Sequence, residues 1–215
     1  MRATLLLGLF LLLTPVPGRA TVGTEFNGLA SFGVGGGLMR WLADEDASSL
    51  DGQAAQVRPI GKAVFRYRFS TNWLAALEAG YGWNGYAESG DRTLIVIPLT
   101  LGMERRLGDM WGLTMSGAGG AGIYVWGLRQ DGQFLRDPET TKTIQAVDPG
   151  LYAGGTGEFH LSNHVTSTVH WNFHYIFSTH KSDYPTMLGE NDLFTELRIG
   201  VNYYFSPYEG LVWGE

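Results

Sequence analysis

The sequence predicts an all-β protein, and within that class an eight-stranded antiparallel up-and-down transmembrane β-barrel. Two observations predict it. Apolar residues recur at a spacing of two along eight long stretches, a pattern that gives a strand two faces in different surroundings. Short and long connections then alternate between those stretches, as they do in a membrane barrel with tight turns at one end and loops at the other.

Each strand is placed by its alternating stretch. In chain order the expected strands are Phe26–Trp41, Ala55–Phe69, Trp73–Asn84, Arg92–Leu107, Trp111–Leu128, Val147–Leu161, Val165–Ser178 and Leu193–Phe205. No window of the chain favours a helical period of 3.6 instead. The glycines of Gly33–Gly37 and Ser116–Gly122 would weaken an ordinary strand, but they permit the sharp coiling that closure of a small barrel requires.

The apolar faces follow from alternate positions. On the first expected strand the apolar face contains Ala30, Phe32, Val34 and Leu38, and on the second it contains Val57, Pro59, Ala63, Phe65, Tyr67 and Phe69. On the third strand it contains Trp73, Ala75, Leu77, Ala79, Tyr81 and Trp83, and on the fourth it contains Ile95, Ile97, Leu99, Leu101 and Met103. On the sixth expected strand the apolar face contains Leu151, Ala153 and Phe159, and on the seventh it contains Val165, Val169, Trp171, Phe173, Tyr175 and Phe177. On the eighth strand it contains Leu193, Leu197, Ile199, Val201, Tyr203 and Phe205. Aromatic residues near the strand ends are typical of the two interfaces of a membrane.

The connections support a barrel independently of the strands. Three are short enough for tight hairpin turns: Ser70–Asn72, Gly108–Met110 and Ser162–His164. The other four are longer: Leu42–Ala54, Gly85–Asp91, Arg129–Ala146 and Thr179–Asp192. A soluble β-sandwich is the alternative, but a sandwich has no reason to sort its connections by length.

The N-terminus predicts export. Residues 1–20 combine Arg2, an apolar run over Leu5–Leu13 and the small residues Gly18 and Ala20 at the −3 and −1 positions, which is the pattern of a secretory signal peptide cleaved after Ala20. The expected organisation is therefore a signal peptide (1–20), a barrel (21–205) and a short periplasmic tail (206–215). Without the signal the chain has 13 basic and 21 acidic residues, a net charge of −8, which excludes nucleic acid as an expected partner. The absence of cysteine excludes disulfides and thiol chemistry.

The last expected strand carries a family resemblance. Its outer positions Leu197, Ile199, Val201, Tyr203 and Phe205 form an alternating apolar stretch that ends in an aromatic residue. This resembles the closing strand of bacterial outer-membrane β-barrels, and the whole pattern resembles the small OmpA-, OmpX- and OmpW-like barrels. One departure is the ten residues that follow Phe205.

That resemblance implies location, partners and role. It implies the bacterial outer membrane, contact with outer-membrane lipid and lipopolysaccharide, recognition of the closing strand by the outer-membrane assembly machinery, and a monomer. It also implies short turns in the periplasm and long connections outside the cell. The expected function is non-enzymatic, either structural or in surface interaction, with no cofactor and no metal. An alternative is a transporter of small apolar molecules, as in OmpW-like proteins.

The faces opposite the apolar ones contain many charged residues. The expected inward set is Arg58, Lys62, Arg66, Arg68, Glu78, Glu104, Glu158, His160, His170, His174, Glu196 and Arg198. Because eight strands enclose only enough space for side chains, we expect these groups to form an internal network of ion pairs. An alternative is a polar conduit or proton path that uses His170 and His174.

Two other clusters suggest chemistry. His180 and Ser182 resemble the His-x-Ser of the outer-membrane lipid A deacylase family, with Glu196 as the acid, although Asp183 stands where that family has asparagine. In that case His180 would be the base and Ser182 the nucleophile. The first long connection contains acidic residues that could bind Ca²⁺, although a solvated loop is favoured. These are Asp44, Glu45, Asp46 and Asp51.

Overall fold

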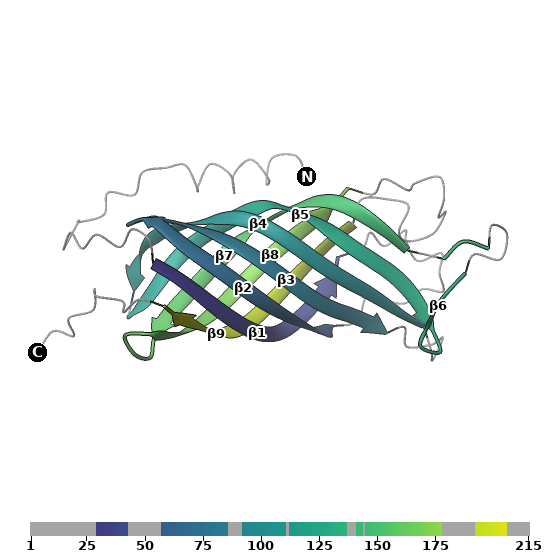
Figure 1. The fold of residues 1–215 in the computed structure, drawn as a ribbon, viewed down its shortest axis with the longest axis horizontal. Helices are drawn as coiled ribbons and strands as arrows, with labels where there is room; N and C mark the ends of the chain where they lie inside the picture. Colours follow the sequence, from purple (N-terminus) through teal and green to yellow (C-terminus); the bar gives the residue numbers. More distant parts are fainter. Residues whose placement is uncertain are drawn as a thin grey trace, which may run out of the picture.

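The computed structural model describes residues 29–42, 57–85, 92–110, 112–136, 141–143, 145–177 and 192–205. These parts of the chain form eight long strands and one very short strand (Figure 1). The strands are β1 (Leu29–Trp41), β2 (Arg58–Ser70), β3 (Trp73–Gly85), β4 (Arg92–Met110), β5 (Leu113–Gln130), β6 (Gln133–Phe134), β7 (Gln145–His160), β8 (Val165–Ile176) and β9 (Asp192–Tyr204). Within the described ranges no helix is long and apolar enough to cross a membrane.

The sheet closes on itself. Every long strand pairs antiparallel with two other long strands: for example, β1 pairs with β2 and β9, and β4 pairs with β3 and β5. The long strands therefore form a ring in chain order, which confirms the expected eight-stranded up-and-down β-barrel. Figure 1 shows the strands wrapping diagonally around the long axis of the molecule, with β6 at one end.

One predicted turn is wrong. Gly108–Met110 lies inside β4, where it pairs with the first three residues of β5. A bulge between Arg106 and Gly108 shifts the register and lets the strand continue. Gly112, directly before β5, has a φ of 78°, which favours glycine.

The connection expected at Arg129–Ala146 is partly a hairpin. Strand β5 continues to Gln130 and pairs with β6 through a two-residue turn. Asp131 and Gly132 form this turn with φ angles of 52° and 77°. An Asp-Gly pair suits a turn that needs positive φ at both positions, so the sequence did contain a signal for this hairpin.

The two faces of the barrel have inverted polarity compared with a soluble protein. The outer face consists of apolar side chains, such as Leu101 and Ile199, each 63% exposed. The inner face contains charged side chains with almost no exposure, such as Lys62 at 4% and Glu196 at 0%. Charged groups are rarely buried in soluble domains, and large apolar patches are rarely exposed.

Glycines on the inner face make room for large side chains from other strands. A Cβ atom on Gly102 would overlap the Tyr152 hydroxyl, and one on Gly150 would lie 2.6 Å from the Tyr124 ring. The interior is therefore packed by large residues that fit over small ones, as expected where an eight-stranded barrel has no spare volume.

Candidate functional site in the barrel interior

The centre of the barrel contains an ion-pair network that joins strands far apart in sequence. Glu78 on β3 accepts hydrogen bonds from Lys62 on β2 (3.2 Å) and from Arg198 on β9 (3.0 and 3.1 Å). Lys62 also donates to Glu196 at 2.7 Å. Glu196 accepts a further hydrogen bond from Asn172 at 3.1 Å. Two bases thus share two acids, which compensates charges that have lost their water.

A second cluster surrounds Arg66 on β2. Its guanidinium lies 3.2 Å from Glu104 and 3.8 Å from Glu158. Glu158 in turn accepts hydrogen bonds from Thr166 (2.7 Å) and from the Tyr204 hydroxyl (2.6 Å). These neutral donors satisfy the carboxylate more fully than one distant guanidinium could.

His170 belongs to this second cluster. Its Nε2 lies 3.1 Å from Arg66 Nη2, and its Nδ1 lies 3.1 Å from Thr156 Oγ1. Because an arginine only donates hydrogen bonds, Nε2 is the acceptor. The ring proton therefore sits on Nδ1, where it is donated to Thr156, and the imidazole is neutral in this arrangement.

His174 lies at the border between charged and apolar packing. Its Nδ1 is 2.8 Å from the Tyr124 hydroxyl, and its Nε2 is 3.5 Å from Glu196. Its ring stacks on Phe194 with centroids 4.4 Å apart, and Tyr152 stacks on it at 5.6 Å. Two different surroundings thus hold the two histidines apart, and no described contact joins them in one chain of hydrogen bonds.

The interior toward the long connections is apolar, which the alternating pattern of the strands does not predict. These buried residues form one cluster: Met39, Ile60, Leu94, Val96, Tyr124, Trp126, Ala146, Ile176 and Phe194. Within it Trp126 donates to Asp148 at 2.7 Å. A signal was present at Leu94–Ile97, where four consecutive apolar residues break the alternation, as expected for a strand segment that is apolar on both faces.

The predicted inward residues lie inside the barrel. Arg58 is partly buried, and the others are buried: Lys62, Arg66, Arg68, Glu78, Glu104, Glu158, His160, His170, His174, Glu196 and Arg198. Arg68 donates to the carbonyl oxygen of Thr71 at the short turn (3.3 Å).

The predicted assembly signal lies on the outer face of β9 and just beyond it. Its exposed residues are Leu197, Ile199, Val201, Tyr203 and Phe205. Tyr203 stacks against His164 of the short turn before β8, with centroids 5.7 Å apart, and contacts Phe205 edge to face. These side chains form a continuous apolar stripe on the outer surface, where lipid or another protein can contact them.

The other candidate sites are only partly described. His180, Ser182 and the acidic group of Asp44, Glu45, Asp46 and Asp51 lie outside the described residues. Glu196, the proposed acid of the hydrolase alternative, lies in the lumen and binds Lys62. Over the part of the chain that the structure describes, no cluster of three or more His, Cys, Asp or Glu residues could hold a metal ion.

Comparison with known proteins supports the fold. No family model matches the sequence, and no curated protein matches it. Among solved structures, the barrel is similar to Ail, the attachment invasion locus protein of Yersinia pestis, at 16% identity and a TM-score of 0.51 over 83% of this chain and 99% of Ail. It is also similar to Neisserial surface protein A at 9% identity and 0.55, over 82% of this chain and 97% of that protein. A major outer membrane protein of Thermus thermophilus matches at 14% identity and 0.50, over 82% and 99%. The chain thus shares the fold of small outer-membrane β-barrels.

Proposed function

We propose that this protein is an integral β-barrel of the bacterial outer membrane with a structural or surface-interaction role and no catalytic function. The observation that carries the proposal is the inverted polarity of the barrel, with apolar side chains outside and paired charges inside. Such a surface is stable against lipid and unstable against water. Outer-membrane lipid and lipopolysaccharide are the partners of the apolar face, and the chain acts as a monomer.

The packed interior supports a scaffold over a channel. Charged side chains cross the lumen from β2, β3 and β9, and the apolar cluster fills the end toward the long connections. Purified protein in planar bilayers is therefore expected to show no large, steady conductance. A stable ion-selective current whose selectivity changes in Arg66→Glu would refute the scaffold proposal.

Location and assembly are tested in cells. The protein is expected in the outer-membrane fraction as a band whose gel migration changes on heating. Phe205→Asp places a charge on the exposed edge after β9, which costs about 1 kcal/mol near an interface and removes the terminal aromatic residue. We expect this variant to assemble poorly, whereas removal of residues 206–215 is tolerated. The reverse pattern would mean that the tail holds the signal.

Topology is tested by labelling. We propose that the short turns face the periplasm and the long connections face the medium. A cysteine in place of Asp109, close to a short turn, should resist an impermeant reagent on intact cells and react after the outer membrane is opened. A cysteine at Gly132, in the β5–β6 turn, is the matched control and should react directly. Labelling of the Asp109 position on intact cells would overturn the topology.

One observation favours a second function, transport of small apolar molecules. The apolar cluster that includes Met39 and Phe194 fills the interior at the end from which such a molecule would enter, so entry would require these side chains to move apart. Uptake by vesicles containing the protein tests this candidate, with Phe194→Ala as the variant expected to change the rate. Equal uptake by vesicles with and without the protein would remove it.

A further inference from the structure

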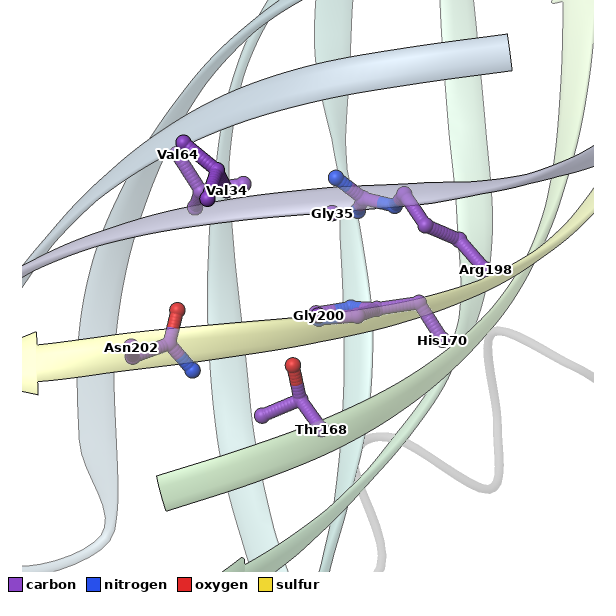
Figure 2. A pocket seen from close by; sticks show the side chains of 8 residues that line it. All are labelled: Val34, Gly35, Val64, Thr168, His170, Arg198, Gly200 and Asn202. Carbon is purple, nitrogen blue, oxygen red and sulfur yellow. The ribbon is translucent and has the colours of Figure 1, made fainter. Parts of the chain in front are cut away.

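A small cavity lies inside the barrel on the side where the first and last strands meet. Its lining residues come from β1, β2, β8 and β9 (Figure 2). They are Val34, Gly35, Val64, Thr168, His170, Arg198, Gly200 and Asn202. The cavity volume is about 10 Å³. A single water molecule needs roughly 10–15 Å³, so the space matches one water and is too small for a hydrated ion or an organic molecule.

The cavity exists because two glycines face each other across the seam. Gly35 of β1 pairs with Gly200 of β9, and Gly200 pairs on its other side with Thr168 of β8. At these three neighbouring inward positions, two residues have no side chain and the third has a short one. Most other inward positions of the barrel have longer side chains. The larger side chains of Arg198 and Asn202, on either side of Gly200, leave this space between them (Figure 2).

A buried polar group points at the same space. The Thr168 side chain is 1% exposed, and its hydroxyl has no hydrogen-bond partner among the described residues. This hydroxyl lies 3.1 Å from the point that a Cβ atom on Gly200 would occupy. The Nε of Arg198, which lines the same cavity, is 3.9 Å from Glu196, beyond hydrogen-bond distance. Buried hydroxyl and N–H groups without a partner cost about 1–3 kcal/mol each, so a partner is strongly favoured.

We propose that this cavity binds one water molecule, hydrogen-bonded to the Thr168 hydroxyl and accepting from Arg198 Nε. The site lies between the two charged clusters, since Arg198 belongs to the Glu78 network and His170 belongs to the Arg66 cluster. The water thereby gives a partner to the Thr168 hydroxyl and links it to the Glu78 network through Arg198. It is an internal site and part of the packing of the barrel.

A crystal structure at about 1.5 Å resolution tests the proposal on the wild-type protein. The expected result is one density peak within about 2.6–3.2 Å of Thr168 Oγ1 that refines as oxygen. A bromide soak separates water from a halide bound by the same donors. No peak at this position, or an anomalous bromide signal there, would overturn the proposal.

Variants locate the site. Gly200→Ala puts a methyl group in the cavity, and we expect the peak to disappear. Ser167→Val is the matched control, because it removes a hydroxyl from the same strand on the outer face, and the peak should remain. Loss of the peak in both variants, or its persistence in Gly200→Ala, would contradict the assignment. If Gly200→Ala does not fold, water-to-protein nuclear Overhauser effects at Thr168 in the wild type give the same test, and their absence refutes the bound water.

Discussion

The two parts of the barrel interior are filled by different chemistry. Toward the long connections the packing is apolar, with Met39, Ile60 and Phe194 in one cluster. In the middle it is ionic, and Glu78 alone binds two bases from different strands. Apolar packing depends mainly on volume, so similar shapes replace one another at small cost. Ion pairs without water depend on every partner, so the loss of one leaves the others uncompensated. The two parts should therefore respond differently to equally small changes.

The largest expected effect comes from breaking the ionic part at its centre. Glu78→Ala leaves Lys62 and Arg198 with one shared acid, and we expect the free energy of unfolding to fall by about 3–5 kcal/mol. The measurement is denaturant unfolding in phospholipid vesicles, followed by the heat-sensitive gel shift. Glu78→Gln keeps the shape and removes the charge, so it should also lose most of that stability. Wild-type stability in Glu78→Gln would show that volume matters here and charge does not.

An intermediate effect is expected where a glycine makes room for a large residue. In Gly102→Ala the new methyl group would overlap the Tyr152 hydroxyl and lie 2.5 Å from the backbone oxygen of Gly119. We expect a loss of about 1–3 kcal/mol, as for other overpacked interiors. Gly36→Ala is the control, because its methyl group would meet only one atom within 4 Å, at 3.9 Å. Equal losses in both variants would point to backbone effects in place of interior packing.

A smaller effect is expected from an exchange of shape in the apolar part. Met39→Leu preserves apolar volume approximately, and we expect a loss below about 1.5 kcal/mol in the same unfolding measurement. The comparison with Glu78→Gln is direct, since both variants keep size and only one removes a charge. A loss in Met39→Leu as large as in Glu78→Gln would remove the distinction between the two parts.

The smallest effect is expected from an ion pair that water reaches. Arg106 and Asp109 form a salt bridge near a short turn, where the Asp109 side chain is 51% exposed. Exposed pairs contribute about 0–1 kcal/mol, so Asp109→Ala should change stability by no more than that. This variant separates burial from charge as the cause of the sensitivity at Glu78. A loss of several kcal/mol would show that water does not screen the pair.

The sequence predicted the ring of strands and the inward position of residues such as Lys62 and Glu78, because alternation is local and its period is two. It did not predict which acid meets which base. Arg198 and Glu78 are 120 positions apart, so their contact depends on the register of several strand pairs. The apolar cluster is not predicted, because alternation between apolar and polar residues identifies an inner face only where that face is polar. Leu94 and Val96 point inward from a strand segment whose outer residues are also apolar, so no alternation distinguishes them.

The turn at Gly108–Met110 was misplaced for a similar reason. Glycine and aspartate are frequent in turns, and at this point they lie beyond a bulge in a strand that continues. A bulge changes the spacing of paired residues by one, which leaves no clear mark in a single sequence. The Asp131-Gly132 hairpin, in contrast, has an ordinary turn signal, but it lies inside the segment Arg129–Ala146, which the strand pattern predicts to be one long connection.

The closing position of β9 has a consequence for the order in which the barrel forms. Synthesis delivers Lys62 and Glu78 early, whereas Glu196 and Arg198, 134 and 120 positions after their respective partners, arrive with the last strand. Until that strand pairs with β1, Lys62 and Glu78 have only each other, because the second acid and the second base of the network both come from β9. Docking of β9 therefore adds one acid and one base together, and it completes the network in one step without changing the net charge of the interior.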